Sequence, residues 1–373
     1  MRPDLPDQVE IVTADALRKL NGATKPNIIA RTLDHIYFAK GQPGLVLFDF
    51  DQKGMPADVR QRIDEAGGFE AALLSVLPEL ANAARLIRSS TSAGLRNAET
   101  GEPFPSIGGA HVYTVAEDAA DIPRFLNAAH QRAWLAGFGW GMIGKAGQFL
   151  ERSIIDATVG SPERLVVEGA PVLVPPVMQD TAARKPQVSP GPALDTRAAC
   201  HNLTVKELAD YERRVASERD RLAPAAAAAR AAFIEAHARE ITERAGISKP
   251  EATRVVEQQI AGRLLPSVML DFDDEDLGRC TVAEVLADPE RFIGAKLADP
   301  IEGIDYGRGK AMVLRDDRNG GLRIHSFAHG LGLNYQLQLD TAAIEAAILA
   351  ADKSKAAEVL MSMALGVEIT PST

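Results

Sequence analysis

The chain has 373 residues and a mass of 39.9 kDa, and its 41 Lys and Arg against 51 Asp and Glu give a net charge of −10. Hydrophobic residues make up 46% and charged residues 25%, a balance that excludes a disordered or fibrous chain. The acidic total argues against a protein that coats DNA non-specifically, although a nucleic-acid enzyme needs only a local basic groove. The length predicts two or three domains.

The sequence also indicates the cellular compartment in which the protein is expected. No apolar stretch reaches the roughly 20 residues that span a bilayer, so no transmembrane helix and no membrane partner are expected. The start, MRPDLPDQVE, lacks the basic end and apolar core of a signal peptide. The two cysteines, Cys200 and Cys280, are too few for a disulfide framework or a four-ligand zinc site, so no zinc is expected. We therefore expect a cytoplasmic protein.

Residues 1–178 alternate apolar runs with helical stretches, which predicts an α/β (α+β) domain with a mixed sheet. The clearest strand is 44–51, a buried-strand pattern that ends in acids. The other elements predicted here are strands at 85–90, 110–115, 152–159 and 164–173 and helices at 70–84 and 123–135.

Four parts are predicted after the first domain: a Pro-rich linker over 179–199, a helical accessory region over 200–265, a small mixed α/β accessory domain over 266–340, and a C-terminal helix over 341–373. Their charges differ, because 184–263 carries fourteen basic and eleven acidic residues whereas 264–306 carries three basic and eleven acidic. The net charge of the whole chain therefore says little about the first domain.

Three capping boxes predict helix starts in these later parts, at Thr204 with Glu207, Ser248 with Glu251 and Thr281 with Glu284. Pro224 interrupts the long Ala- and Arg-rich stretch and is expected to start a new helix or to kink the existing one.

The strongest chemical feature is Asp49-Phe-Asp51, at the end of the 44–51 strand. Residues i and i+2 of a strand point to the same face, so both carboxylates are expected to project together. Such a pair suits Mg²⁺ or Mn²⁺, which take oxygen ligands. Two such ions about 3.5–4 Å apart can hold the attacking and leaving oxygens of a phosphoryl transfer. Two solvated acids at a strand end are the alternative.

Asp156 and His111 extend this pattern. Asp156 is expected within an apolar strand, where a charge needs a metal or a partner such as an arginine. His111 follows the Gly108-Gly109 pair and is able to donate a hydrogen bond to a phosphate oxygen. A structural histidine on an apolar strand is the alternative for His111.

Taken in chain order, Asp49-Phe-Asp51, Ser106-Ile-Gly-Gly-Ala-His111 and Ile155-Asp156 resemble the three motifs of the archaeo-eukaryotic primase superfamily. The second motif matches loosely, because Gly109 stands where the family places a serine two residues before the histidine. The zinc module of many primases has no counterpart here, which puts zinc-dependent template recognition in doubt.

Neighbouring segments extend the resemblance to the primase-polymerase domains of phages, plasmids and integrated elements. These segments are Arg88-Ser-Ser-Thr-Ser-Ala-Gly94, Leu150-Glu-Arg-Ser-Ile-Ile-Asp156 and Ser161-Pro-Glu-Arg-Leu165. Further along, Asp299-Pro-Ile-Glu-Gly303 and Ile324-His-Ser-Phe-Ala-His-Gly330 resemble segments downstream of such domains in the replication proteins of mobile elements.

The resemblance implies a primase-polymerase of a mobile genetic element. Asp49, Asp51 and Asp156 would hold two Mg²⁺ or Mn²⁺ ions, and His111 would contact the triphosphate of an incoming NTP or dNTP. The reaction would extend a primer on a single-stranded DNA template, and any replicative helicase would come from a separate chain or a missing region. Four side chains beside the motifs are candidates for nucleotide binding: Arg88, Ser89, Ser90 and Arg152.

Gly139-Trp-Gly-Met-Ile-Gly-Lys-Ala146 matches a P-loop except that Ala146 replaces the hydroxyl residue that would hold Mg²⁺. The stretch also follows a predicted helix rather than a strand. We expect a Gly-rich turn here, in which Lys145 contacts DNA phosphate.

Two other functions compete. A strand that ends in DxD also resembles the nucleophile motif of haloacid-dehalogenase-like phosphatases, with Asp49 as nucleophile, although Lys53 stands where those enzymes carry Thr or Val. A non-catalytic replication initiator is the other alternative, and its basic helical segment would bind DNA phosphates.

Overall fold

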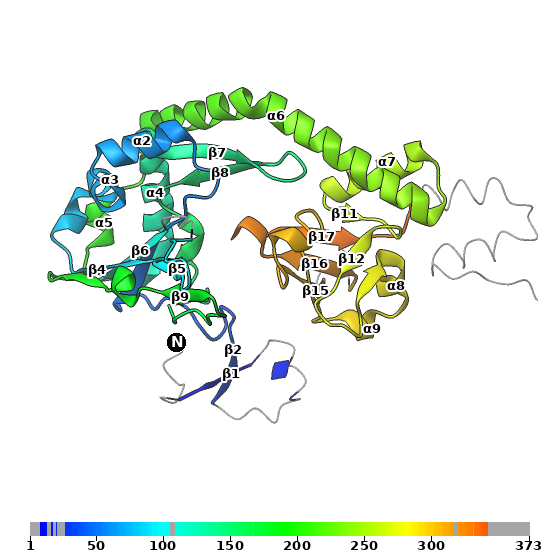
Figure 1. Ribbon diagram of the computed structural model, residues 1–373, viewed down its shortest axis with the longest axis horizontal. Coiled ribbons are helices and arrows are strands. Elements are labelled where there is room, and N and C mark those ends of the chain that lie inside the picture. The colour runs from blue at the N-terminus through cyan, green and yellow to red at the C-terminus, as the bar shows by residue number, and fades with distance from the viewer. Residues whose placement is uncertain are drawn as a thin grey trace, which may run out of the picture. The chain divides into compact units, whose positions relative to one another are not determined.

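The computed structural model describes residues 8–12, 16–17, 20, 27–104, 109–166, 168–316, 320–330 and 332–341. In this part of the chain the protein is a mixture of α-helices and several small β-sheets (Figure 1), which confirms the α+β class in general terms. Two compact units are present. The first comprises Met1–Met142 and Glu151–Arg221, and the second comprises Ile143–Leu150 and Leu222–Thr373.

Two sequence-based expectations are only partly covered by these residues. The predicted C-terminal helix over 341–373 lies outside the described residues except for Thr341, and Ser106 of the second motif also lies outside them. Among the described helices, none is long and apolar enough to cross a lipid bilayer.

The first unit holds most of the short elements, while Ile143–Leu150, the tip of a β-hairpin, belongs to the second unit. With η for a 3₁₀-helix, its elements are β1 (Glu10–Val12), β2 (Ile28–Ala30), β3 (Gly44–Phe50), α2 (Ala57–Glu65), α3 (Phe69–Val76), η1 (Pro78–Ala81), β4 (Arg85–Ser89), β5 (Leu95–Asn97), β6 (Ala110–Ala116), η2 (Ala119–Asp121), α4 (Ile122–Leu135), β7 (Gly139–Ile143), β8 (Phe149–Ser153), η3 (Ala157–Gly160), β9 (Val177–Gln179), η4 (Thr181–Arg184), β10 (Gln187–Ser189) and α5 (Thr196–Ala199).

The main sheet of the first unit has the strand order β10-β4-β6-β3, and each neighbouring pair is antiparallel. The expected mixed sheet is therefore wrong for this domain. Strands β3 and β4 are parallel to one another, as the strand–helix–strand pattern suggested, but β6 lies between them and runs the opposite way. Strand–helix alternation does not reveal such an inserted strand.

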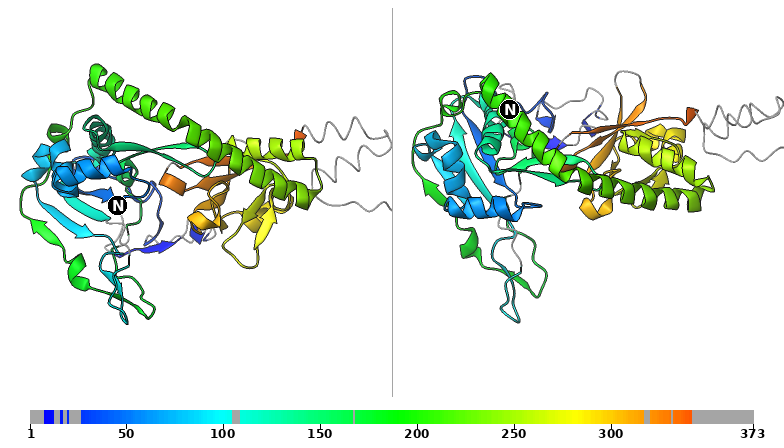
Figure 2. Two further views of the ribbon diagram at one scale, coloured as in Figure 1. Left: turned by 45° about the horizontal axis from the view of Figure 1, so that its top comes forward. Right: turned by 90° about the horizontal axis from the view of Figure 1, so that it is seen from above.

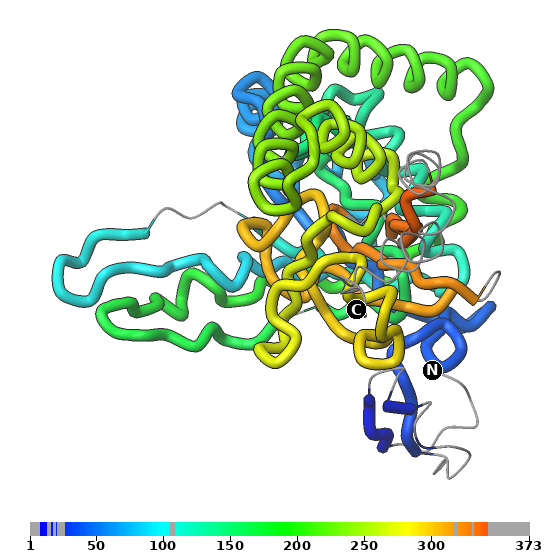
Figure 3. Tube along the Cα trace, turned by 90° about the vertical axis from the view of Figure 1, so that its right-hand side faces the viewer, coloured from blue at the N-terminus to red at the C-terminus, as the bar shows by residue number. Residues whose placement is uncertain are grey.

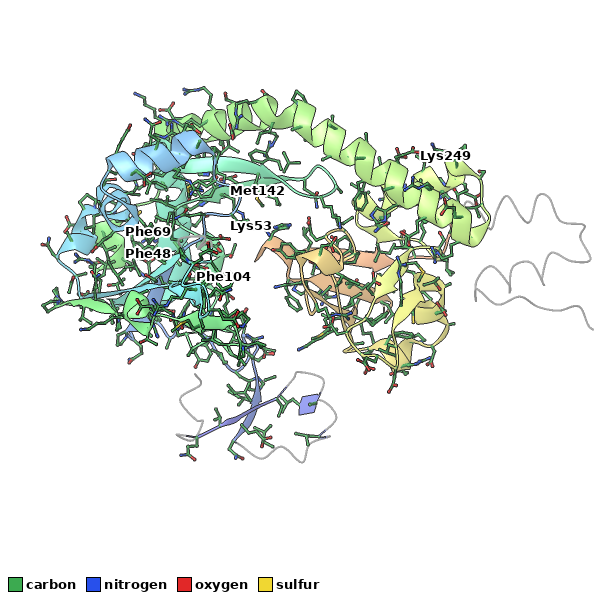
Figure 4. The ribbon with its side chains drawn as sticks, viewed as in Figure 1. Phe48, Lys53, Phe69, Phe104, Met142 and Lys249 are labelled. Carbon is green, nitrogen blue, oxygen red and sulfur yellow. The ribbon has the colours of Figure 1, made fainter. Side chains whose placement is uncertain are left out.

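One face of this sheet forms the core of the first unit. Val46, Phe48 and Phe50 alternate along β3 and are buried, which is the period expected for a strand with one face against the core. The Phe50 ring stacks on Phe69 of α3 with ring centroids 4.2 Å apart, and the Phe48 ring meets Phe125 of α4 edge-on. Figure 4 labels Phe48 and Phe69 in this layer. The residues between them, Leu47 and Asp49, point to the opposite face of the sheet.

The segment predicted as a linker, 179–199, is part of the first unit instead. Strand β10 extends the sheet by pairing with β4, and Leu194 is buried in the same core as β3. Proline is tolerated at the ends of an edge strand, where no ladder hydrogen bond is lost. Pro186 and Pro190 flank β10 in this way. The proline content therefore marked a sheet edge and not a free connection.

Two predicted strands near Asp156 are also corrected. Strand β8 ends at Ser153, and the chain then turns into η3, whose N-cap is Asp156. Over 164–166 and 168–173 the chain forms no strand. Within the described residues, the apolar run there pairs with no strand, and several of its side chains are exposed, including Leu165 and Val172.

The second unit combines the predicted helical region with the predicted small domain. Its elements are the C-terminal part of α6 (Val205–Ala245), α7 (Lys249–Ile260), β11 (Arg263–Leu264), β12 (Met269–Asp271), β13 (Arg279–Thr281), α8 (Val282–Ala287), α9 (Pro289–Phe292), β14 (Lys296–Leu297), η5 (Ile304–Tyr306), β15 (Ala311–Arg315), β16 (Leu322–Ser326), η6 (Ala328–Gly330) and β17 (Asn334–Leu337). Helix and strand residues such as Phe233, Val255 and Val313 share one core, so the two parts fold together.

The sheet of the second unit is the mixed one, with order β11-β17-β16-β15-β14 and a single parallel pair, β11–β17. Thr281 and Glu284 form the predicted capping box of α8. Helix α6 runs without interruption over 205–245 although it contains Pro224 (Figure 2). The boundary between the units falls at Arg221, one turn before that proline.

Candidate functional site

The candidate site is a row of three side chains across the main sheet. Asp49 of β3 stands opposite His111 of β6, and His111 stands opposite Arg88 of β4. The His111 Nε2 atom lies 3.4 Å from the Asp49 carboxylate. Since directly opposed residues in a sheet point to the same side, all three occupy the face away from the core. The ladder thus joins two motifs that are 62 positions apart in the sequence.

A glycine at the rim allows the strands to approach at this end of the sheet. A Cβ atom at Gly109 would lie 3.2 Å from the Ser90 Cβ and 3.3 Å from the Phe50 carbonyl oxygen. The Ser90 N–H donates to the Gly109 carbonyl at 2.9 Å. A side chain at this position would push β4 or β3 away from β6, so the glycine helps to hold the row together.

A carboxylate that the sequence did not single out completes the site. Glu168 accepts a short hydrogen bond from His111 Nδ1 and a 2.5 Å hydrogen bond from the Tyr113 hydroxyl. Its second oxygen lies 3.4 Å from Arg88 Nη1 and 3.8 Å from Arg184 Nη2. Three hydrogen-bond donors and the Arg184 guanidinium, from three elements, therefore surround one carboxylate.

Arg184 is held in place by the chain around it. Strands β5 and β9 pair antiparallel and lie side by side in Figure 3, in cyan and green. The Gln179 side chain donates to the Thr91 and Ala93 carbonyls at 2.8 Å each, which fixes the end of β9. Helix η4 follows directly, contacts β4, and buries Arg184 to 4% exposure.

The pKa values of the site reflect these contacts. The hydrogen bond to Asp49 raises the pKa of His111; burial opposes this rise, and Glu168 supports it. Burial and the hydrogen bond to Glu168 raise the pKa of Tyr113, which remains a neutral donor. Burial acts to raise the pKa of Glu168, but the hydrogen bonds from Tyr113 and His111 outweigh it and the pKa is lowered. The site therefore stabilises a negative charge at the Glu168 position.

Asp51 follows β3 directly and is exposed. Its carboxylate accepts a 2.9 Å hydrogen bond from the Lys53 N–H, which closes a tight turn. Gly54 continues the turn with φ of 68°, and a Cβ there would lie 2.5 Å from the Met142 sulfur. Figure 4 labels Lys53 and Met142, which lie close together. The turn is thereby packed against β7 while the carboxylate faces solvent.

Asp156 is presented by a turn and not by a strand. Its carboxylate accepts a 2.8 Å hydrogen bond from the Thr158 N–H and so caps η3. Helix η3 contacts both β3 and α4, which brings the third motif against the strand that carries the first. The Ser153 hydroxyl fixes the preceding turn by donating to the Ile155 carbonyl at 2.9 Å and accepting from the Ile155 N–H.

The donor set fits a hard divalent cation in kind. Asp49 and Asp51 supply two carboxylates two positions apart, and Mg²⁺ is commonly bound through one or two carboxylates together with substrate phosphates. Over the residues that the structure describes, no three Asp, Glu, His or Cys side chains are gathered closely enough to hold one metal ion.

The remaining predicted residues are dispersed. Ser89 stands opposite Ala110, in the row of the buried Phe50, so it shares the core face and not the face of Arg88. The Ser90 hydroxyl lies 3.2 Å from the Ser92 hydroxyl. Arg152 lies on β8, between Glu151 and Ser153.

Lys145 lies in the turn between β7 and β8, which is the predicted Gly-rich turn. Its ammonium group donates to the Glu302 carbonyl at 3.1 Å and lies 3.5 Å from the Asp305 carboxylate. Strand, turn and strand replace the strand–loop–helix of a P-loop, so this segment lacks the helix N-terminus that would face a phosphate.

Sequence reasoning missed Tyr113, Glu168 and Arg184. Tyr113 could have been found, because it is two residues after His111 on the same strand face. Glu168 and Arg184 gave no such signal, since their positions depend on an irregular segment and on the β5–β9 pairing.

Comparison with known proteins finds no matching family model, no matching curated protein and no matching solved structure.

Proposed function

We propose that the first unit catalyses metal-dependent nucleotidyl transfer from an NTP or dNTP onto a primer on a single-stranded DNA template, as a primase-polymerase. The observation that carries the proposal is the row of Asp49, His111 and Arg88 across three adjacent strands. Two of the segments that resemble motifs of the archaeo-eukaryotic primase superfamily contribute to this row, and the helix η3 that follows the third such segment contacts β3.

Each side chain has a role that its chemistry supports. Asp49 and Asp51, with Asp156, are the carboxylates that would hold Mg²⁺ or Mn²⁺, which lower the pKa of a primer hydroxyl and stabilise charge on the reacting phosphate. His111 and Arg88 donate hydrogen bonds to the triphosphate and orient it toward the primer. The Tyr113 hydroxyl adds a neutral donor on the same face.

The alternatives account for less of the site. A phosphatase with Asp49 as nucleophile gives no role to the opposed His111 and Arg88. A non-catalytic initiator would bind DNA and show no metal-dependent chemistry.

The test is incubation of the protein with primed single-stranded DNA, labelled nucleotides, and Mg²⁺ or Mn²⁺. We expect extension by the wild-type protein and its loss in Asp49→Asn, Asp51→Asn and Asp156→Asn. Asp64→Asn is the matched control. Asp64 is exposed on α2 in the same unit, and its substitution removes the same charge. Mn²⁺ affinity, measured by calorimetry, gives a readout that does not depend on activity.

The outcomes separate the three functions. Extension that survives in Asp49→Asn would remove that residue from the proposed metal site. Release of phosphate from a phosphomonoester, without extension, would favour the phosphatase. DNA binding with neither reaction would favour the initiator.

A further inference from the structure

The Glu168 carboxylate is surrounded by hydrogen-bond donors and cationic groups on the face of the main sheet that lies away from the core. Its two oxygens accept hydrogen bonds from His111, Tyr113 and Arg88, and one of them forms a 3.8 Å ion pair with Arg184. Arg184 also reaches the backbone, donating to the Glu168 and Gly169 carbonyls at 3.4 Å each. Hydrogen bonds to an ionised carboxylate such as Glu168 are stronger than hydrogen bonds between neutral groups.

In the part of the chain that the structure describes, two donor atoms of the surrounding arginines are left without a partner. Over the described residues, the Nε atoms of Arg88 and Arg184 are buried and have no hydrogen-bond partner. A buried donor without a partner carries a desolvation cost. Phosphate groups offer more acceptor oxygens and more negative charge than a carboxylate, and arginine matches their geometry. These side chains are therefore better matched to a phosphate group than to the Glu168 carboxylate.

The chain that carries Glu168 has little else to hold it. The Glu168 segment, defined as 164–166 and 168–174, forms no helix or strand. Several of its apolar side chains face solvent, with Val172 95% and Val174 71% exposed. Segments with few buried apolar contacts open at low free-energy cost. The ionic contacts of Glu168 are the main described attachment of this segment to the sheet.

We propose that Arg88, His111, Tyr113 and Arg184 form a polyphosphate-binding pocket, and that Glu168 is an internal occupant which the incoming polyphosphate displaces. The inference rests on the proposed function only for the nature of the ligand, the polyphosphate chain of a nucleoside triphosphate. Two negative groups cannot share the same four donors, so binding of the phosphate and release of the Glu168 segment are linked.

The pocket is tested by the affinity of inorganic tripolyphosphate in EDTA, so that no metal ion contributes. Removing the competing carboxylate in Glu168→Ala is expected to raise the affinity about tenfold or more, and Glu168→Gln to raise it less, because the amide keeps one acceptor. Arg184→Gln should weaken binding in the Glu168→Ala background. Glu117→Ala is the matched control. Glu117 is exposed just beyond β6, and its substitution removes the same charge.

Displacement is tested by elastase cleavage within the Glu168 segment. Tripolyphosphate should speed cleavage of the wild-type protein, and Glu168→Ala should be cleaved quickly with or without it. The proposal is overturned if Glu168→Ala binds tripolyphosphate no better than wild type, if Glu117→Ala gains as much, or if bound tripolyphosphate leaves the cleavage rate unchanged. A gain in affinity together with absent primer extension would reject the proposed function and leave the pocket standing.

Discussion

At the scale of single residues, His111 lies between two carboxylates, Asp49 on one side and Glu168 on the other. We predict that His111→Ala weakens nucleotide binding about ten- to a hundredfold, because a hydrogen bond to a charged group contributes roughly 1.5–3 kcal/mol. Binding of single-stranded DNA should change much less. Calorimetric titration of each ligand measures both effects, with His201→Ala, an exposed histidine of the same unit, as control. Equal losses for nucleotide and DNA would assign His111 a structural role.

Gly109 is a second position where one atom decides the geometry of the row. We predict that Gly109→Ala lowers the free energy of unfolding by about 1–3 kcal/mol, since the added methyl meets Ser90 and the Phe50 backbone. Gly169→Ala is the control, because a Cβ at Gly169 meets no atom within 4 Å, and such changes usually stay within about 0.5 kcal/mol. Urea unfolding compares the two. A Gly109→Ala protein as stable as wild type would mean that the strands can separate without cost.

At the scale of elements, Asp121 ties α4 to α5. The carboxylate is 6% exposed and accepts hydrogen bonds from Arg124 at 2.6 and 2.7 Å and from the Thr196 hydroxyl at 2.6 Å. The hydrogen bond from Arg124, supported by Thr196 and opposed by burial, lowers the pKa of Asp121. This contact fixes the segment that was expected to be a linker.

A group whose folded pKa is lowered stabilises the protein above its unfolded pKa, and this contribution is lost as the pH falls through the folded pKa. We therefore predict that Asp121→Asn lowers the free energy of unfolding by about 2 kcal/mol at pH 7. The difference from wild type should shrink below about pH 4, the ordinary pKa of aspartate. Urea unfolding across this range measures it, with Asp64→Asn as the exposed control. A difference that did not depend on pH would contradict the assignment to the ionised carboxylate.

At the scale of the whole molecule, the boundary between the units defines which fragments fold. We predict that a fragment ending at Arg221 unfolds cooperatively, whereas one ending at residue 180 does not, because it lacks β10 and the buried Leu194 and Cys200. The longer fragment also retains Tyr211, whose hydroxyl donates to Glu151 of β8. Circular dichroism during urea unfolding distinguishes the fragments. A cooperative transition in the 1–180 fragment would show that β10 is dispensable.

The same boundary divides the proposed activities. Asp49, Asp51, His111 and Asp156 belong to the first unit, so the fragment ending at Arg221 is expected to keep metal-dependent extension of a supplied primer. De novo priming must hold two nucleotides and a template without a stable duplex, and we expect truncation to reduce it more. Primer extension and de novo synthesis are measured side by side. Equal loss of both, in a fragment that is folded, would refute this division of labour.

The sequence by itself determined the features that arise from short-range patterns. The apolar run at 44–51 and the strand pattern at 110–115 predicted β3 and β6, and the structure confirms both strands and sets Asp49 opposite His111. The pairing of Thr281 with Glu284 predicted a helix start, because a cap satisfies N–H groups within a few residues. In each case the atoms that interact are near one another along the chain, or the side chain simply follows the strand period.

The tertiary structure alone decided the features that depend on which distant segment comes to lie alongside. Periodicity along 85–90 predicts a strand but cannot reveal that β6 enters between β3 and β4, or that β10 joins the edge. Asp156 caps η3 because the Ser153 turn ends β8 early, whereas an apolar run favours a longer strand. Glu168 and Arg184 meet only because the β5–β9 pairing and the sheet bring them together. Such contacts join residues that are far apart in the sequence, and they stabilise the protein only once the chain has folded.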